Sequence, residues 1–271
     1  MNTTNRVKLK RWIKIIIIIY CAIGIALYYL QETFLFHPVK LDSNYIFKFD
    51  GRFEEVKLPV NKEDTISLVK FFPGDSLKKG IVLYYHGNMK NIEHYASYVQ
   101  YFIKNGYEVW MGDYPGYGKT TGKRTEQKMY DQARMIHTLA MSEISKDSII
   151  IYGKSLGTGI AAYVASYNPA RALVLETPYY SIPSLFSHYA FIYPVNYLSK
   201  YKIPTHEFLQ DMKTPIIIFH GTGDDVIPYS NARKLIPFLK KEDRFITIKS
   251  GGHNTLSRFK EYSNVMDSLL N

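Results

Sequence analysis

Apolar residues recur along this chain in two alternating patterns. Five short runs are apolar almost throughout, as strands covered on both faces of a parallel sheet must be; they are residues 80–87, 106–114, 148–153, 171–177 and 215–221. Longer segments with helical spacing of apolar residues lie between and after them, at residues 91–104, 125–145, 157–167, 230–240 and 257–270. This alternation predicts an α/β fold built on a doubly wound, mostly parallel sheet.

Two further segments complete the predicted architecture. Residues 52–60 and 65–72 alternate apolar and polar positions, which predicts an antiparallel lead-in to the sheet. Residues 178–214 are rich in Tyr, Phe and Pro, and this stretch is too long for an ordinary connection. We expect it to form a short cap inserted over one end of the sheet, with aromatic side chains that either line a pocket or pack the cap itself.

The amino-terminal part of the chain has a different pattern. The apolar run WIKIIIIIYCAIGIALYYL extends from Trp12 to Leu30, and Lys14 is its only charged residue. A helix of this length crosses the hydrocarbon core of a bilayer. The sequence therefore predicts three parts: a basic amino terminus at residues 1–12, a transmembrane anchor at 13–30, and a globular domain at 31–271 that includes the cap.

Charge predicts the orientation of this anchor. Basic residues cluster before the apolar run, so the positive-inside rule places the amino terminus in the cytoplasm and residues 31–271 on the non-cytoplasmic side of the membrane. A cleaved signal peptide has a similar charged start and apolar middle, and it remains one alternative. A buried core helix is the other, although such helices carry more polar residues. The segment YYLQETFLF is a poor cleavage site because it lacks small residues at the required spacing.

The composition argues against several functions. The net charge is +10, but five basic residues at or before the start of the anchor account for half of it, and the rest is spread without a basic stripe. Nucleic-acid binding is therefore not expected. Cys21 is the only cysteine, so neither an internal disulfide nor a cysteine-based zinc site can form. The eight histidines show no metal-ligand spacing, and we expect neither a metal nor a cofactor.

One serine lies where chemistry is expected. The pentapeptide Gly153-Lys154-Ser155-Leu156-Gly157 falls at the junction between a predicted strand and a predicted helix. A sharp turn there holds a serine in strained backbone geometry and projects its hydroxyl above the carboxyl edge of the sheet. Ser155 is thus a candidate nucleophile. A role as a simple helix cap is the alternative.

A serine hydroxyl needs a base to take its proton and an acceptor to orient that base. Asp224 and Asp225 follow the strand at 215–221. His253 follows a further predicted strand, in the segment FITIKSGGHN at 245–254, and lies in its glycine-rich loop. The order serine, aspartate, histidine is the one that a nucleophile elbow of this kind uses. Each residue alone has a simpler explanation, since aspartates favour turns and loop histidines are often only exposed. The convergence of three strand ends favours a catalytic triad.

The same reaction needs backbone N–H groups that stabilise an oxyanion. Leu156, directly after the candidate nucleophile, supplies one such donor. The loop HGN that follows the strand at 80–87 supplies a second, and Asn88 is the residue we expect to provide it. His86-Gly87 as a plain turn is the alternative, and His220-Gly221 is interpreted as structural support.

Several motifs together resemble the α/β-hydrolase superfamily: HGN at 86, DYPGYGKTTG at 113, GKSLGTG at 153, HGTGDDVIP at 220 and GGHN at 251. The chain looks most like the membrane-anchored, ABHD-type serine hydrolases of that superfamily. The resemblance implies an α/β-hydrolase domain over residues 31–271. It also implies that Asp224, rather than Asp225, is the triad acid.

The resemblance further implies a serine hydrolase of carboxylesterase or acyl-hydrolase type that works through an acyl-enzyme. A carboxylic ester or thioester is the expected substrate class, with a small-molecule, lipid or otherwise acylated substrate, and the membrane is the expected partner through the amino-terminal helix. A serine peptidase with the same triad is one alternative, for which Glu176 or Glu207 would capture a free amino group. A non-catalytic anchored binding protein is the other. Lys154 receives no role from the sequence.

Overall fold

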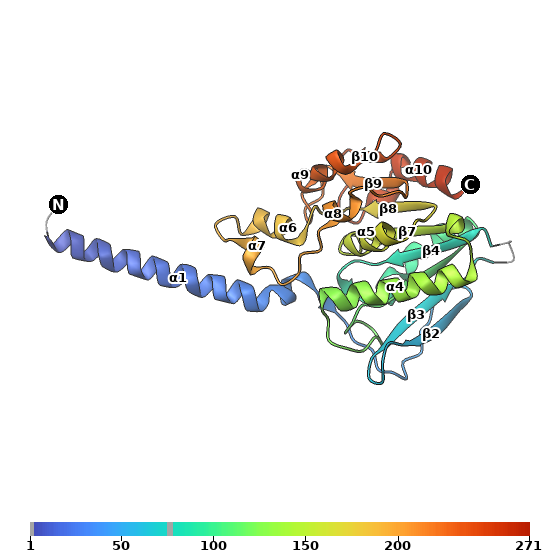
Figure 1. Cartoon of the computed structure of the whole chain (residues 1–271), viewed down its shortest axis with the longest axis horizontal. Coiled ribbons are helices and arrows are strands. Elements are labelled where there is room, and N and C mark those ends of the chain that lie inside the picture. The colour runs from blue at the N-terminus through green and yellow to red at the C-terminus, as the bar shows by residue number, and fades with distance from the viewer. Residues whose placement is uncertain (1–2, 75–77) are drawn as a thin grey trace.

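A long helix extends from a layered α/β body (Figure 1). The computed structural model describes residues 3–74 and 78–271. The long helix, α1, runs from Thr3 to Leu35, and the carboxyl-terminal helix α10 ends at the far side of the body (Figure 1). The body is built around one large sheet, with helices on both of its faces.

The sheet is mostly parallel. Within the described residues it contains eight strands in the order β10-β9-β8-β7-β4-β6-β3-β2. Only β2 and β3 run antiparallel to their neighbours along the β2-β3-β6 edge, as the lead-in pattern predicts. A separate parallel pair, β1 with β5, lies outside this sheet. The bounds are β1 His37–Pro38, β2 Phe53–Pro59, β3 Thr65–Phe71, β4 Gly80–Tyr85, β5 Met89–Lys90, β6 Tyr107–Gly112, β7 Ile149–Lys154, β8 Ala172–Glu176, β9 Ile216–Gly221 and β10 Arg244–Ile248.

The two faces of the sheet carry separate apolar cores. Along β7, Ile149 and Ile151 belong to one core while Ile150 and Tyr152 belong to the other, because successive side chains of a strand point to opposite faces. Helices α4 (Glu126–Glu143) and α5 (Gly157–Tyr167) cover the first face, and α2 (Ile92–Tyr95), α3 (Gln100–Lys104) and α10 (Lys260–Leu270) cover the second. This double coverage explains the nearly continuous apolar strands and confirms the predicted fold class.

Three predicted helices are less regular than their apolar patterns indicate. The segment at 91–104 is helical, but its middle turn, η1 (Ala96–Val99), is a 3-10 helix between α2 and α3. The segment at 230–240 is a short α9 (Tyr229–Ala232) followed by the 3-10 helix η3 (Arg233–Phe238). Pro237 lies inside η3 and has no N–H to donate, so an α-helix cannot continue through it. The segment at 257–270 begins in the 3-10 turn η4 (Leu256–Arg258), and its α-helix, α10, starts at Lys260. A further 3-10 turn, η2 (Lys146–Ser148), precedes β7.

The cap consists of three short helices, α6 (Ile182–Tyr189), α7 (Val195–Leu198) and α8 (Thr205–Leu209). The hydroxyl of Ser181 accepts a hydrogen bond from the Ser184 N–H at 3.2 Å and caps the start of α6. Figure 1 shows α6 and α7 beside the carboxyl-terminal part of α1, at the side of the body where that helix ends. The cap therefore lies next to α1.

Helix α1 is continuous across the predicted boundaries. Residues Arg6–Leu35 are long and apolar enough to cross a membrane by length and composition. The helix does not end at residue 30 but continues to Leu35. The boundaries at 12/13 and 30/31, the crossing itself and its orientation stay predictions.

Candidate active site

Ser155 occupies a sharp turn between β7 and α5. Its φ angle is +51°, in the left-handed region that a non-glycine residue seldom adopts. Its two glycine neighbours are sterically required. A Cβ on Gly157 would lie 2.0 Å from the Tyr85 carbonyl oxygen, and one on Gly153 would lie 2.6 Å from the carbonyl oxygen of Gly157. Gly157 therefore permits the turn to pass close to β4, and Gly153 permits α5 to pack closely on the end of β7.

The structure brings together three side chains that the sequence singles out. The Nε2 of His253 lies 3.0 Å from the Oγ of Ser155. On the other side of the ring, His253 Nδ1 lies 2.9 Å from one carboxylate oxygen of Asp224 and 3.1 Å from the other. Asp224 follows β9 and His253 follows β10, so the parallel order of the strands brings both loops to the edge where β7 ends. This is the geometry of a nucleophile, a base and an orienting acid.

Asp224 is held as a carboxylate. Burial alone would raise its pKa, but the hydrogen bond and charge of His253 and the N–H of Ile227 more than offset this, and the net pKa lies below its usual value. One oxygen also accepts hydrogen bonds from the N–H groups of Val226 and Ile227, at 2.9 and 2.8 Å. Asp225 is exposed to solvent. The structure thus brings Asp224, and not Asp225, to the histidine.

His220 lies beneath this pair and is fully buried. Its Nε2 is 2.9 Å from the Ile227 carbonyl oxygen and 3.4 Å from an Asp224 oxygen. Burial lowers the pKa of His220, while Asp224 opposes that shift. A neutral imidazole with its proton on Nε2 donates to the Ile227 carbonyl and supports the turn that carries Asp224.

Two backbone N–H groups, those of Asn88 and Leu156, lie at the cavity that Ser155 lines. Within residues 3–74 and 78–271, neither backbone N–H has a hydrogen-bond partner. The loop before Asn88 lies close to the serine, since a Cβ on Gly87 would lie 3.5 Å from the Cβ of Ser155. Both residues thus stay candidates for oxyanion donors.

Two tyrosines of the DYPGYGKTTG motif, for which the sequence alone indicates no role, hold this loop in place. The hydroxyl of Tyr114 donates to the His86 carbonyl oxygen at 2.7 Å, and that of Tyr117 donates to the Asn88 carbonyl oxygen at 2.8 Å. Both tyrosines are buried, at 4% and 0% exposure. The side-chain amide of Asn88 donates to the carbonyl oxygen of Leu35 at 2.9 Å. The loop is therefore fixed from both sides.

Lys154 forms a buried ion pair that the sequence alone does not reveal. Its ammonium group bonds the carboxylate of Glu176, and both residues are almost fully buried, at 1% and 2% exposure. Glu176 also accepts from the Tyr152 hydroxyl, and its backbone carbonyl accepts the Ser155 N–H at 2.9 Å. The pair joins the ends of β7 and β8 directly before the serine turn. Their side chains lie outside the set that lines the cavity.

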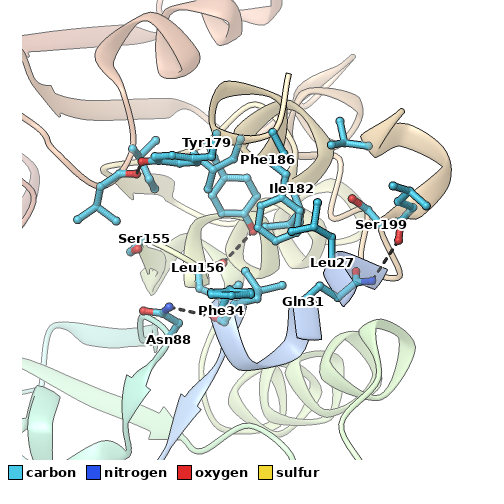
Figure 2. Close-up of a pocket in the computed structure, with 18 residues that line it drawn as sticks. Leu27, Gln31, Phe34, Asn88, Ser155, Leu156, Tyr179, Ile182, Phe186 and Ser199 are labelled. Carbon is cyan, nitrogen blue, oxygen red and sulfur yellow. Dashed lines mark hydrogen bonds between the residues drawn. The ribbon is translucent and has the colours of Figure 1, made fainter. Parts of the chain in front are cut away.

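The serine opens into a largely apolar cavity of about 480 Å³ (Figure 2). Ligand pockets have volumes of this order. Its described lining contains no Asp, Glu, Lys or Arg. The lining residues are Leu27, Gln31, Phe34, Leu35, Asn88, Ser155, Leu156, Tyr179, Ile182, Leu185, Phe186, Tyr189, Ala190, Val195, Leu198, Ser199, Val226 and Ile227. The cap aromatics both line the pocket and pack the protein interior. Tyr179, Phe186 and Tyr189 line the cavity, whereas Tyr201 packs on Phe36.

Sequence comparison finds a matching family and similar proteins. Residues 76–205 match the family described as serine aminopeptidase, S33. An uncharacterized protein of Mycobacterium tuberculosis is 28% identical over 188 residues, which cover 68% of this chain and 66% of that protein. Human alpha/beta hydrolase domain-containing protein 17B is 26% identical over 192 residues, covering 68% of this chain and 64% of that protein. The matched region thus spans slightly less than two thirds of these relatives.

Solved structures share the fold. The Pyrococcus furiosus esterase Pf2001 aligns with a TM-score of 0.66 and 17% identity over 87% of this chain and 97% of that one. A soluble variant of the Saccharomyces cerevisiae monoglyceride lipase, in complex with a substrate analog, aligns with a TM-score of 0.63 and 17% identity over 84% of this chain and 98% of that one.

The sheet order, the serine turn and these alignments define an α/β-hydrolase fold. The chain belongs to the α/β-hydrolase superfamily.

Proposed function

We propose that this protein is a serine hydrolase that cleaves a carboxylic ester or thioester with an apolar acyl group. The observation that carries the proposal is the contact chain from Ser155 through His253 to Asp224 at the mouth of an apolar cavity without charged lining residues among those described. Membership of a hydrolase superfamily supports the same reaction class.

The proposed reaction has two half-reactions. His253 Nε2 takes the proton of Ser155 as the serine oxygen attacks the carbonyl carbon, and Asp224 stabilises the resulting imidazolium. The N–H groups of Asn88 and Leu156 donate to the oxyanion. When the bond to the leaving group breaks, His253 gives its proton to the departing alcohol or thiol, and an acyl-enzyme remains on Ser155. A water molecule, deprotonated by His253, then releases the acid and restores the serine.

A fluorophosphonate probe and a p-nitrophenyl ester test this proposal on the full chain in detergent. We expect the wild-type protein to be labelled and to turn over the ester. Ser155→Ala should lose labelling and lower turnover by several orders of magnitude. Ser166→Ala is the matched control, because Ser166 is exposed on α5 and donates only to the Tyr163 carbonyl. Labelling that persists in Ser155→Ala would exclude the proposed nucleophile.

Amide hydrolysis is the second candidate, since the matching family is described as a serine aminopeptidase. An aminopeptidase needs an acidic group that binds the free amino terminus. Glu176 is bound to Lys154 and buried, and Glu207 does not line the cavity. These positions favour ester over aminopeptidase chemistry. Release of p-nitroaniline from an aminoacyl substrate at a rate equal to ester cleavage would reverse this preference.

Helix α1 also supports a membrane-bound location. We propose that it anchors the hydrolase domain, with the amino terminus in the cytoplasm and the domain on the non-cytoplasmic side, because its apolar length suits a bilayer and basic residues precede it. Protease protection of a carboxyl-terminal tag in sealed cells tests the orientation. Digestion of the tag by external protease is expected, and protection would reverse the assignment.

A further inference from the structure

One wall of the apolar cavity belongs to α1. Leu27, Gln31, Phe34 and Leu35 line the cavity together with residues of the cap and of the serine turn. Their spacing places them on one face of the helix. Figure 2 shows Phe34 near Leu156, with Leu27 and Gln31 farther from Ser155. The helix that resembles a membrane anchor is therefore also part of the candidate binding site.

Gln31 fixes the helix against the cap. Its side chain is 5% exposed. The amide nitrogen donates to the Leu198 carbonyl oxygen at 3.1 Å, and the amide oxygen accepts the Lys200 N–H at 2.7 Å. A buried amide that satisfies both of its functions sets a single register between two segments. The cavity wall at Leu27 is consequently held in a defined position.

The contact with the cap continues toward the middle of the apolar run. The ring of Tyr20 stacks on Tyr193 with 4.6 Å between the centroids, and the Tyr20 hydroxyl donates to the Ile192 carbonyl oxygen at 2.9 Å. Gly24 permits this approach, since a Cβ there would lie 3.3 Å from the Tyr193 ring. From Tyr20 to Leu35 the helix rises about 22 Å at 1.5 Å per residue.

The cap surface beside this contact is apolar and exposed. Phe191 is 81% exposed, Ile192 58% and Tyr197 89%. Exposed large apolar side chains that lie together mark a surface that binds something apolar. This surface lies beside α1 at Tyr20, and the isoleucines of α1 are also exposed over a length that suits a bilayer. Because Tyr20 lies in the middle of the Trp12–Leu30 run, the cap tip reaches the depth of the hydrocarbon core when α1 crosses the membrane.

We propose that α1 is the substrate-loading wall of the enzyme, and that a lipid leaflet covers Phe191, Ile192 and Tyr197. The acyl chain of an ester or thioester resident in the membrane passes from the leaflet into the space between α1 and the cap, with its carbonyl group at Ser155. The substrate class is a long-chain acyl amphiphile. This inference rests on the proposed serine hydrolase function.

Replacement of one wall residue tests the role of α1. Full-length protein in phosphatidylcholine nanodiscs is assayed with p-nitrophenyl butyrate and p-nitrophenyl palmitate. Leu27→Trp fills the distal cavity, and we expect the palmitate-to-butyrate rate ratio to fall at least tenfold. Leu30→Trp is the matched control on the same helix, because Leu30 is 50% exposed and does not line the cavity. Its ratio should stay within twofold of the wild-type value.

The outcomes separate the two proposals. Wild-type protein that is labelled at Ser155, with equal ratios in both tryptophan variants, would overturn the role of α1 alone. Wild-type protein without labelling or ester turnover would overturn the proposed hydrolase and, with it, this inference.

A second pair of variants tests the lipid contact. We expect Phe191→Asp to lower the hydrolysis of palmitate ester embedded in phosphatidylcholine vesicles at least fivefold. Ile236→Asp is the control, since Ile236 is an exposed apolar residue on η3, at 41% exposure. Equal rates in the two variants would refute lipid contact at the cap tip. Loss of a stable dimer in Phe191→Asp would assign the surface to a second copy of the chain and refute it as well.

Discussion

The Nε2 atom of His253 lies 3.0 Å from the Oγ of Ser155, although 98 positions separate the two residues in the chain. The contact arises because β7, β9 and β10 run parallel and end at one edge of the sheet. Three loops that follow these strands converge there, and the buried Asp224 orients the histidine from the opposite side. Each element of the proposed mechanism can be tested separately.

Asp224→Asn should leave the fold intact and lower ester turnover by about four orders of magnitude. The amide can donate to His253 Nδ1 and hold the imidazole in the wrong tautomer, as the general logic of the triad requires. Asp225→Asn is the matched control, since Asp225 is exposed and has no contact with the histidine. Steady-state kinetics with a p-nitrophenyl ester measure both. Equal activity of the two variants would contradict the role of Asp224.

Tyr117→Phe should lower kcat about tenfold and leave KM nearly unchanged. The variant loses the hydrogen bond to the Asn88 carbonyl oxygen and loosens a proposed oxyanion donor that acts mainly in the transition state. Tyr167→Phe makes the same chemical change at a residue that is 60% exposed, and it should have no effect on kcat. A rise in KM at constant kcat would instead indicate a role in substrate binding.

Lys154→Met should destabilise the protein by about 3–5 kcal/mol, because it leaves the buried Glu176 without its cation. The double variant Lys154→Met/Glu176→Gln should recover part of this loss, since no buried charge remains. Lys128→Met breaks the partly exposed pair with Asp64 and should lower the unfolding temperature much less, because water screens that pair. Thermal unfolding in detergent compares the three. If Lys154→Met and Lys128→Met unfold at the same temperature, the buried pair does not stabilise the fold.

We expect the burial of His137 to make the free energy of unfolding decrease as the pH drops below neutral. It is 1% exposed on α4, and burial lowers its pKa to about 4 from 6.5. Below about pH 6.5 the unfolded chain takes up a proton that the folded protein does not accept until near pH 4. The free energy of unfolding is thus highest above about pH 6.5, where His137 is neutral in both states. It decreases by about 2 kcal/mol between pH 7 and 5.

His137→Leu should therefore reduce the difference between the unfolding temperatures at pH 7 and pH 5. The exposed His37, replaced in the same way, serves as the control and should leave that difference unchanged. An undiminished difference in His137→Leu would assign the acid sensitivity to other groups, such as the buried His220.

Much of the fold follows from local pattern. Strands buried on both faces must be apolar throughout, so their positions could be read with an error of one or two residues. The serine turn and the two loops that meet it follow from the rule that parallel strands end at a common edge. The prediction of a helix at 230–240 is less accurate. The apolar spacing alone indicates a regular α-helix, but Pro237 prevents one.

Other parts of the site depend on packing between distant segments, for which the sequence has no local signal. The bond from Gln31 to Leu198 joins residues 167 positions apart. The Tyr117 hydroxyl also bonds a distant segment, the loop at Asn88, and Lys154 bonds Glu176 on the neighbouring strand. Composition marked residues 13–30 as a membrane segment, but nothing in that composition indicates that the helix also lines a cavity.

The attachment of α1 to the cap has a practical consequence for biochemistry. A fragment that starts after Leu35, made to obtain a freely dissolved enzyme, would lack Leu27, Gln31, Phe34 and Leu35 and would open the cavity to water on that side. Acyl-chain selectivity measured on such a truncated protein would describe a binding site that the intact molecule does not have.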